Sequence, residues 1–150
     1  MFIFLFFPVL LPPQCRKYIV LKEASRNISY GYGKNNDQDR SKTKITGSSN
    51  QWYRFQAPAG TKMPDDSPSI DGKRCGTEFT GWLKGGHPTK AGQVVSRTVC
   101  FSKQSEKCAF WPYFDLSKSV KVTHCGSYFV YQLPSTSNGR NYNMRYCATN

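Results

Sequence analysis

Six cysteines in a chain of 150 residues constrain this fold more than any other sequence feature. The number is even, the chain is short, and it begins with an apolar segment, a combination that favours disulfides formed in the secretory pathway over free cytosolic thiols. The residues alone leave all fifteen pairings open. Zinc is the rival use of cysteine, but no Cys-x-x-Cys pair occurs and the two histidines are far apart in sequence. We therefore expect no metal and no cofactor.

The first 14 residues, MFIFLFFPVLLPPQ, resemble a signal peptide. Their apolar core of about ten residues is too short to span a bilayer but suits the hydrophobic region of such a peptide. No basic residue precedes the core and no small-x-small cleavage motif follows it, so a start site further upstream is the alternative. We expect export, removal of residues up to about Gln14, retention of Cys15, and no membrane span in this chain.

Short alternating segments predict a mainly β domain over residues 15–150. Residues 52–55, 94–100, 119–123 and 128–133 alternate apolar with polar side chains, as half-buried strands do. Glycine- and proline-rich turns separate these segments, and no long helix is indicated. We predict a small, disulfide-stabilised, loop-rich extracellular domain with compact, sandwich-like sheets. The residues expected in its core are Trp52, Phe55, Trp82, Val95, Val99, Val130 and Leu133.

The charge balance favours anionic partners. Lysine and arginine number 21 against nine acidic residues, giving a net charge of +12 and a pI near 9.6. A solvated cationic surface without a specific partner is the alternative interpretation. Part of the charge lies in residues 33–50, a polar segment that we expect to be an exposed loop. The cations there that we consider for binding are Lys34, Arg40, Lys42 and Lys44.

Residues 110–114, FWPYF, are the densest aromatic cluster in the chain. Such a cluster either packs into the core or forms an exposed ligand platform. Under the second interpretation Trp111 and Tyr113 are the candidate contacts. Asn27–Ile28–Ser29 is the one N-glycosylation sequon, so Asn27 is a candidate glycan acceptor in an exported chain.

Two alternatives to a binding module are a purely structural spacer domain of a longer protein and a small, basic, secreted hydrolase that resembles a ribonuclease. His87 and His124 are the available acid–base pair, and Lys84 or Lys121 would stabilise a phosphate. Nothing in the sequence brings the two histidines together. We therefore expect a protein that is not an enzyme.

An ordered series of motifs resembles the eight-cysteine domain of uromodulin, the pancreatic secretory granule membrane glycoprotein and the oncoprotein-induced transcript proteins. The series covers roughly residues 15–147 and is clearest after Trp52. Its pieces are WYRF at 52–55, Gly60, Met63, RC at 74–75, WL at 82–83, HP at 87–88, Gly92, the segment 94–100, Cys125, YFVYQL at 128–133 and YC at 146–147.

The resemblance implies a non-catalytic extracellular module. Together with the net charge of +12 it favours a module that binds glycans or glycoproteins, including anionic ones, and we expect no nucleic-acid partner. The resemblance also implies the pairs Cys15–Cys125, Cys75–Cys147 and Cys100–Cys108, and two of the family's bridges are missing. In such proteins N-glycans on this domain can be lectin targets. The asparagines that the family pattern places in WL.G and VY.L are Lys84 and Gln132 here, so those two glycans are absent.

Overall fold

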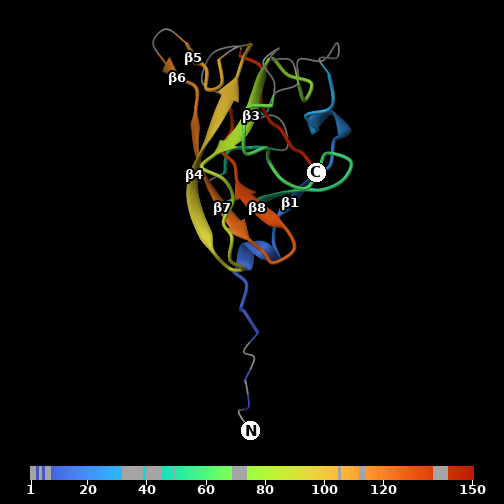
Figure 1. Ribbon diagram of the computed structural model, residues 1–150, viewed down its shortest axis with the longest axis vertical. Helices are drawn as coiled ribbons and strands as arrows, with labels where there is room; N and C mark the ends of the chain where they lie inside the picture. The colour runs from blue at the N-terminus through green and yellow to red at the C-terminus, as the bar shows by residue number, and fades with distance from the viewer. Residues whose placement is uncertain are drawn as a thin grey trace.

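The computed structural model describes residues 3, 5, 8–31, 39, 45–48, 50–68, 74–104, 106–111, 114–136 and 142–150, with only the backbone of residues 110, 111 and 114. Within these ranges the chain forms nine strands and two short 3₁₀ helices (Figure 1). The elements are η1 (Pro13–Cys15), β1 (Ile19–Leu21), η2 (Ala24–Arg26), β2 (Tyr53–Phe55), β3 (Phe79–Lys84), β4 (Val94–Ser102), β5 (Phe110–Trp111), β6 (Phe114–Asp115), β7 (Lys118–His124), β8 (Phe129–Gln132) and β9 (Met144–Tyr146).

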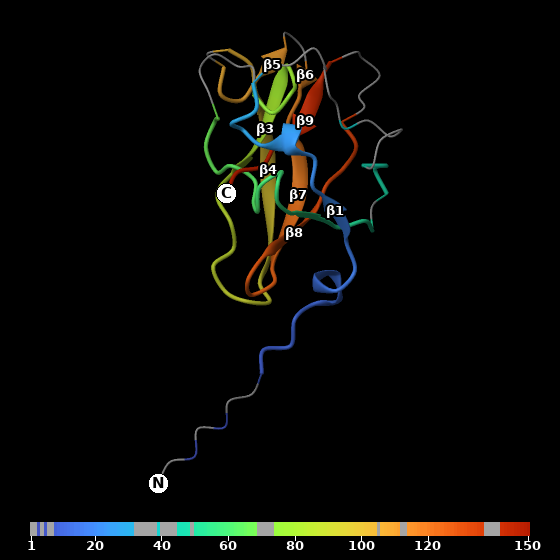
Figure 2. The same ribbon diagram turned by 90° about the vertical axis from the view of Figure 1, so that its right-hand side faces the viewer.

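Seven of these strands form one sheet in the order β1-β2-β8-β7-β4-β3-β9, while β5 and β6 form a separate hairpin. The pairs at the two edges, β1–β2 and β3–β9, are parallel, and the pairs between them are antiparallel. The long strands β4 and β7 run side by side along the molecule, and β9 lies beside β3 at the opposite end from η1 (Figures 1 and 2). The mainly β class predicted from alternation is therefore confirmed.

The sheet is curled, and its two faces differ in chemistry. Val95, Val122 and Tyr131 occupy paired positions on β4, β7 and β8, so their side chains share the inner face. This face joins the apolar side chains of β2, β3 and β9 in one buried cluster. The alternate positions, which include Ser96, Lys121 and Gln132, form the outer face. The sandwich-like core thus arises from one sheet that encloses its own inner face.

Two residues predicted in the core are only partly buried. Phe55, Trp82, Val99, Val130 and Leu133 are buried as expected. Trp52 is half-buried because it precedes β2 and packs on a small satellite cluster at the rim of the sheet. Val95 is partly exposed because β3 pairs with β4 only from Thr98 onward, leaving Val95 with β7 as its one neighbouring strand.

The segment 33–50, predicted to be an exposed loop, contributes buried side chains to the interior. Asp39 is 1% exposed and Ile45 is fully buried. Ile45 belongs to the main apolar cluster, and Asp39 has an ion-pair partner in the interior. The exposed-loop prediction is therefore wrong at these two positions. The polar composition of the segment gave no indication that Ile45 is buried among apolar side chains or that Asp39 pairs with an arginine distant in sequence.

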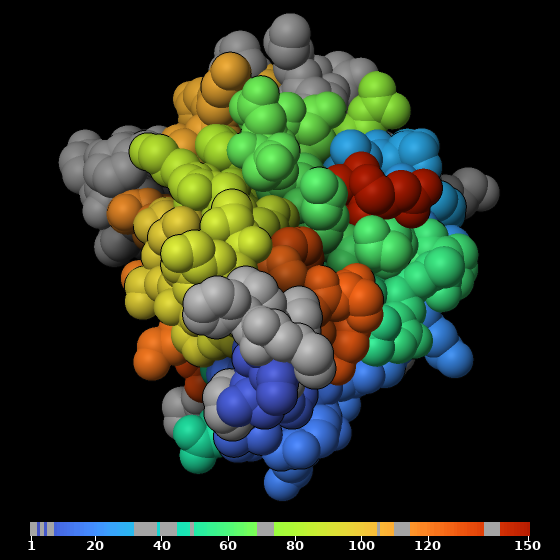
Figure 3. Space-filling model, turned by 60° about the horizontal axis from the view of Figure 1, so that its bottom comes forward, coloured from blue at the N-terminus to red at the C-terminus, as the bar shows by residue number. Residues whose placement is uncertain are grey.

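The N-terminal segment extends from the molecule at the end where η1 lies (Figure 1). Val9 and Leu10 are 64% and 87% exposed. Figure 3 looks onto this end and shows the described part of the segment, in dark blue, near turns drawn in yellow and orange. The described residues contain no helix with the length and apolarity needed to cross a membrane.

Candidate functional site

Three disulfides cross-link the fold, two of them between segments far apart in sequence. They join Cys15 to Cys125, Cys75 to Cys147, and Cys100 to Cys108. These are the pairs that the family resemblance implies, and no cysteine is left free among the six, all of which the structure describes. The first ties the N-terminal segment to the end of β7, and the second ties the chain after β9 to the turn before β3. The third closes a short loop after β4.

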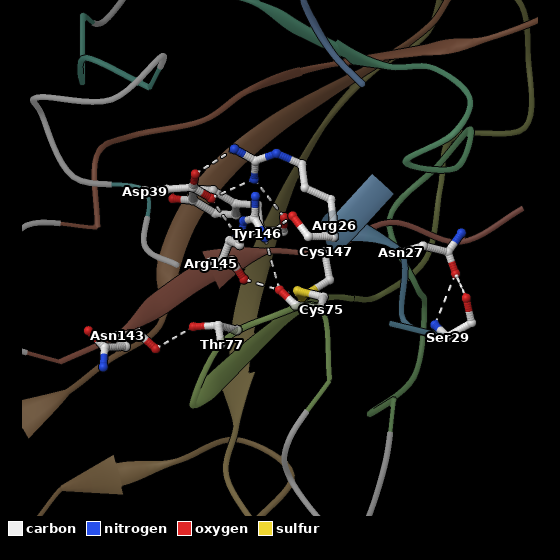
Figure 4. Close-up of a disulfide and its surroundings, with 11 residues drawn as sticks. Arg26, Asn27, Ser29, Asp39, Cys75, Thr77, Asn143, Arg145, Tyr146 and Cys147 are labelled. Carbon is white, nitrogen blue, oxygen red and sulfur yellow. Dashed lines mark hydrogen bonds and ion pairs between the residues drawn. A yellow bond between two sulfur atoms is a disulfide. The ribbon is translucent and has the colours of Figure 1, made fainter. Parts of the chain in front are cut away.

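A buried ion pair lies next to the Cys75–Cys147 bridge (Figure 4). The two terminal guanidinium nitrogens of Arg26 donate to the carboxylate of Asp39, at 2.7 and 2.9 Å, in the fork-to-fork geometry that suits this pair. Arg26 also donates to the carbonyl oxygen of Tyr146, and the backbone N–H of Tyr146 donates to Asp39. These bonds join η2, the segment at residue 39 and β9 into one polar network. No periodic signal indicates it in the sequence, because its members come from three separate segments.

The electrostatics of this network hold Arg26 in its charged form. Burial alone would lower the pKa of the Arg26 guanidinium, but the charge of Asp39 and its hydrogen bonds outweigh burial and raise the pKa above its ordinary value. A second buried arginine, Arg145, donates to the carbonyl oxygen of Cys75 and to the hydroxyl of Ser25. Every named donor here has a protein acceptor within bonding distance, so the network is structural.

Asn27 follows η2 directly and is partly exposed. Its side-chain oxygen accepts hydrogen bonds from the backbone N–H and the hydroxyl of Ser29, at 2.9 and 2.7 Å (Figure 4). The third residue of the sequon is therefore bonded to the acceptor amide. The carbonyl of Ala148 accepts from the N–H of Ile28, which holds the sequon against the chain after β9.

The two histidines contact the same aromatic ring, that of Phe129. His87 and His124 have ring centroids 4.5 and 5.1 Å from that of Phe129. His87 Nε2 lies 2.9 Å from the hydroxyl of Tyr131, and His124 Nδ1 accepts from the N–H of Gly126. The structure thus brings together two residues that the sequence did not. Both side chains have packing and hydrogen-bonding roles.

The candidate phosphate-binding lysine Lys121 does not share a face with these histidines. Phe129 pairs with His124 on the inner face, whereas Lys121 pairs with Gln132 on the outer face. Burial, assisted by the charges of Lys62 and Arg97 and opposed by Asp65, lowers the pKa of His87 to about 4. A histidine that stays neutral near pH 7 beside a tyrosine is suited to packing. Among the described residues no cluster of three metal-ligating side chains occurs.

Most of the candidate binding residues fall outside the described residues. These are Lys34, Arg40, Lys42, Lys44 and Tyr113. Trp111 lies in the hairpin strand β5, where the backbone alone is described. Their part in binding stays a prediction.

Two adjoining hollows, which sequence reasoning did not find, lie beside η1 and on the outer face of β7 and β8. The first, of about 350 Å³, is lined by Pro13, Gln14, Lys17, Ser48, Asn50, Gln51 and Trp52. The second, of about 210 Å³, is lined by Gly47, Ser48, Ser119, Gln132, Leu133 and Pro134. Ser48 lines both, so we treat them as one feature, the outer trough. Four separated segments contribute its walls, which explains why no contiguous motif revealed it.

The protein is a small, disulfide-bonded β domain in which both histidines pack against the ring of Phe129. The family model for the uromodulin-like eight-cysteine domain matches residues 53–148, and the chain belongs to this family. It is 31% identical over 137 residues to the pancreatic secretory granule membrane major glycoprotein GP2 of Rattus norvegicus and 33% identical to that of Mus musculus, with 89% of the chain covered. It is 31% identical over 134 residues to the uromodulin of Rattus norvegicus, again with 89% covered.

Family membership makes this domain a non-catalytic extracellular module. The chain spans about a fifth of the curated relatives it matches, 22% of the GP2 proteins and 18% of the rat uromodulin. The similarity therefore concerns one domain of those glycoproteins.

Proposed function

We propose that this module binds extracellular glycans or glycoproteins that carry negative charge. The observation that carries the proposal is an excess of exposed cations over available carboxylates. Of the acidic side chains, Glu23 and Asp39 pair with Arg26, and Glu78 pairs with Lys103. The exposed described cations are Arg16, Lys17, Lys22, Lys84, Lys90, Lys107 and Lys121. Such a surface attracts polyanions and accelerates their association.

The candidate residues outside the described structure belong to the same proposal. Lys34, Arg40, Lys42 and Lys44 would add charge, and Trp111 with Tyr113 would add aromatic contact area. Charge supplies on-rate and loose affinity, and selectivity requires shaped contacts. We propose no nucleic-acid partner, because the module is extracellular and its relatives are secretory glycoproteins.

A heparin column and an array of extracellular glycans test this function. The exported protein should be retained on heparin beyond physiological ionic strength, about 0.15 M, because many weak screened contacts act together. The charge reversals Lys42→Glu and Lys44→Glu should shift elution to lower salt, and Trp111→Ala should weaken binding without changing the salt dependence. Elution at or below physiological salt, with no array signal above background, contradicts the function.

Export and glycosylation form a second part of the proposal. Cleavage before Cys15 would keep the buried Cys15–Cys125 bridge, and the hydroxyl of Ser29 is bonded to the acceptor amide of Asn27. The secreted product should therefore begin at or near Cys15 and lose mass on treatment with a peptide N-glycosidase. N-terminal sequencing that starts beyond Cys15, or a mass equal to that of the bare polypeptide, contradicts the corresponding step.

A further inference from the structure

We propose that the outer trough is the binding site for an acidic oligosaccharide, one whose sugar units carry sulfate or carboxylate groups. This inference rests on the proposed function and assigns it to a place on the domain. The trough begins at Trp52, beside η1, and continues past Ser48 to Ser119 and Gln132 on the outer face of β7 and β8. Its larger hollow, about 350 Å³, falls within the ~300–1,000 Å³ range of small-molecule sites.

The walls of the trough present the groups that recognise sugar hydroxyls. Serine hydroxyls from Ser48 and Ser119 and side-chain amides from Asn50, Gln51 and Gln132 line the two hollows. Amides and hydroxyls both donate and accept hydrogen bonds, as sugar hydroxyl groups do. A site of this chemistry fits a polyhydroxylated ligand better than an apolar one.

Part of this wall is held in place before any ligand arrives. Gln51 Nε2 donates to the carbonyl oxygen of Trp52 at 3.0 Å. In the uncleaved chain Gln14 Nε2 also donates to the hydroxyl of Thr123 at 3.0 Å, a bond that is lost when residues up to Gln14 are removed. Side chains ordered in advance lose less entropy on binding.

Trp52 supplies an apolar contact, although its alternating segment predicted a place in the core. Trp52 lines the larger hollow and also packs against the buried cluster of Cys15, Cys125 and Val130. A large ring with one side supported by the protein and another facing a polar hollow can pack against the C–H face of a sugar. This accounts for a tryptophan that is half-buried where full burial was expected.

The charge of the trough selects an anionic sugar. Lys17 lines the larger hollow. Lys121 is exposed on the same face as the lining residues of the smaller hollow, because it pairs with Gln132 and lies two residues after Ser119 on β7. No described carboxylate lines either hollow. A third hollow further along the face, about 550 Å³, includes Asp115, whose pKa is lowered by hydrogen bonds from Ser117. Lys84 and Arg97 also line this third hollow, where the carboxylate of Asp115 offsets part of their charge, whereas no described carboxylate opposes Lys17 in the trough.

The proposed site does not depend on the form of the N-terminus. Removal of residues up to Gln14 would take away Pro13 and Gln14 from the rim of the larger hollow. The remaining lining groups, Lys17, Ser48, Asn50, Gln51 and Trp52, follow Cys15 in the sequence. The binding experiment therefore uses the exported chain as secreted.

Isothermal titration with a heparin-derived hexasaccharide compares two double charge reversals of equal net charge. Lys17→Glu alters a lysine that lines the larger hollow, and Lys121→Glu alters the exposed lysine that pairs with Gln132 of the smaller hollow. Lys90→Glu with Lys107→Glu alters exposed lysines that neither line a hollow nor pair with a lining residue. The trough pair should weaken binding about tenfold more than the control pair, a difference that corresponds to about 1.4 kcal/mol. Equal losses in the two double variants would overturn the trough while leaving anionic glycan binding in place.

An isosteric substitution tests the same site without a large change in shape. Asn50→Asp places one negative charge inside the trough and should weaken the hexasaccharide about 3- to 10-fold, whereas Asn150→Asp, which adds the same charge outside it, should change affinity less than about twofold. Side-chain amide resonances of Asn50, Gln51 and Gln132 should shift on titration of the unmodified protein. If these amide resonances do not shift at saturating hexasaccharide, the proposed site is wrong, whatever the affinity of Asn50→Asp.

Two further oligosaccharides separate the sources of negative charge. A hyaluronan hexasaccharide carries carboxylates without sulfate, and maltohexaose carries neither. Binding of one or both acidic hexasaccharides at least about tenfold tighter than maltohexaose is expected for a site with two lysines. Equal affinity for maltohexaose would overturn the selection for charge. Absence of binding to all three would contradict the proposed function itself.

Discussion

The two long-range disulfides lie in opposite surroundings. Cys75–Cys147 adjoins buried charge, where Arg26 and Asp39 are 3% and 1% exposed and bond each other and the backbone of β9. Cys15–Cys125 adjoins aromatic rings at the rim, where Trp52 and Tyr128 remain partly exposed. One bridge closes an interior that excludes water, and the other fastens a surface that water reaches.

This difference separates the structural part of the domain from the part available for binding. A desolvated ion pair requires both partners, because a single charge left in the interior has neither water nor a counter-ion. At the rim, Arg54 lies 3.7 Å from the ring centroid of Tyr128 and donates to the hydroxyl of Tyr18, with part of the side chain exposed. Loss of a rim contact can be compensated by solvent. Substitutions should therefore reduce the free energy of unfolding more near Cys75–Cys147 than near Cys15–Cys125.

Removal of each bridge gives the largest expected effects. The bridges span 72 and 110 residues, and on chain-entropy grounds each contributes about 4–5 kcal/mol. We expect Cys75→Ala with Cys147→Ala to destabilise the domain more than Cys15→Ala with Cys125→Ala. The Cys15–Cys125 loop is longer, but only the Cys75–Cys147 bridge adjoins a buried ion pair. Urea unfolding of both double variants measures the difference. The reverse order would mean that loop length alone decides the cost.

Asp39→Ala isolates the ion pair from the bridge. It leaves the charged guanidinium of Arg26 buried without its carboxylate, which should reduce the free energy of unfolding by about 3–5 kcal/mol. Arg54→Met, the matched change at the rim, should cost about 1 kcal/mol, because a partly exposed cation–π contact is worth little more. Equal losses of free energy of unfolding in Asp39→Ala and Arg54→Met would show that burial does not make the Cys75–Cys147 surroundings more sensitive than the rim.

Acid should destabilise the domain through His87, which packs on Phe129 at the Cys15–Cys125 end. Its folded pKa of about 4 lies below the ordinary value of 6.5, so between these pH values the unfolded chain binds more protons than the folded one. Stability should be complete above about pH 6.5 and decrease toward pH 4, by about 1–2 kcal/mol once partial exposure is allowed for.

Urea midpoints at pH 7, 6 and 5 measure this decrease above the range in which most carboxylates titrate. His87→Gln removes the titrating group and serves as the control, so its midpoint should be flat over the same interval. An equal slope in this variant would assign the acid sensitivity to another group.

Local chemistry made the strands predictable, but it could not show which segments meet. The valines of 94–100 and the aromatic residues of 128–133 occupy the faces that alternation assigns, because side chains on a strand point to opposite faces whatever the tertiary context. The disulfide pairs came from an ordered set of motifs, not from spacing. Asp39 and Ile45 were assigned to a loop because neither a single buried acid nor a lone apolar residue in a polar segment has a period. The outer trough was missed for the same reason, since Lys17, Ser48 and Gln132 come from separate segments.

The smallest expected effect on stability lies at the proposed binding surface. Lys17→Glu changes an exposed side chain that lines the larger hollow, and the free energy of unfolding obtained from urea titration should match that of the unmodified protein within about 0.5 kcal/mol. The same variant should bind the heparin hexasaccharide more weakly, whereas Lys90→Glu should leave stability unchanged and weaken binding much less. Loss of affinity without loss of stability is the combination that a binding surface produces. A substantial fall in stability for Lys17→Glu would instead make Lys17 part of the structural framework and remove the distinction between the two ends.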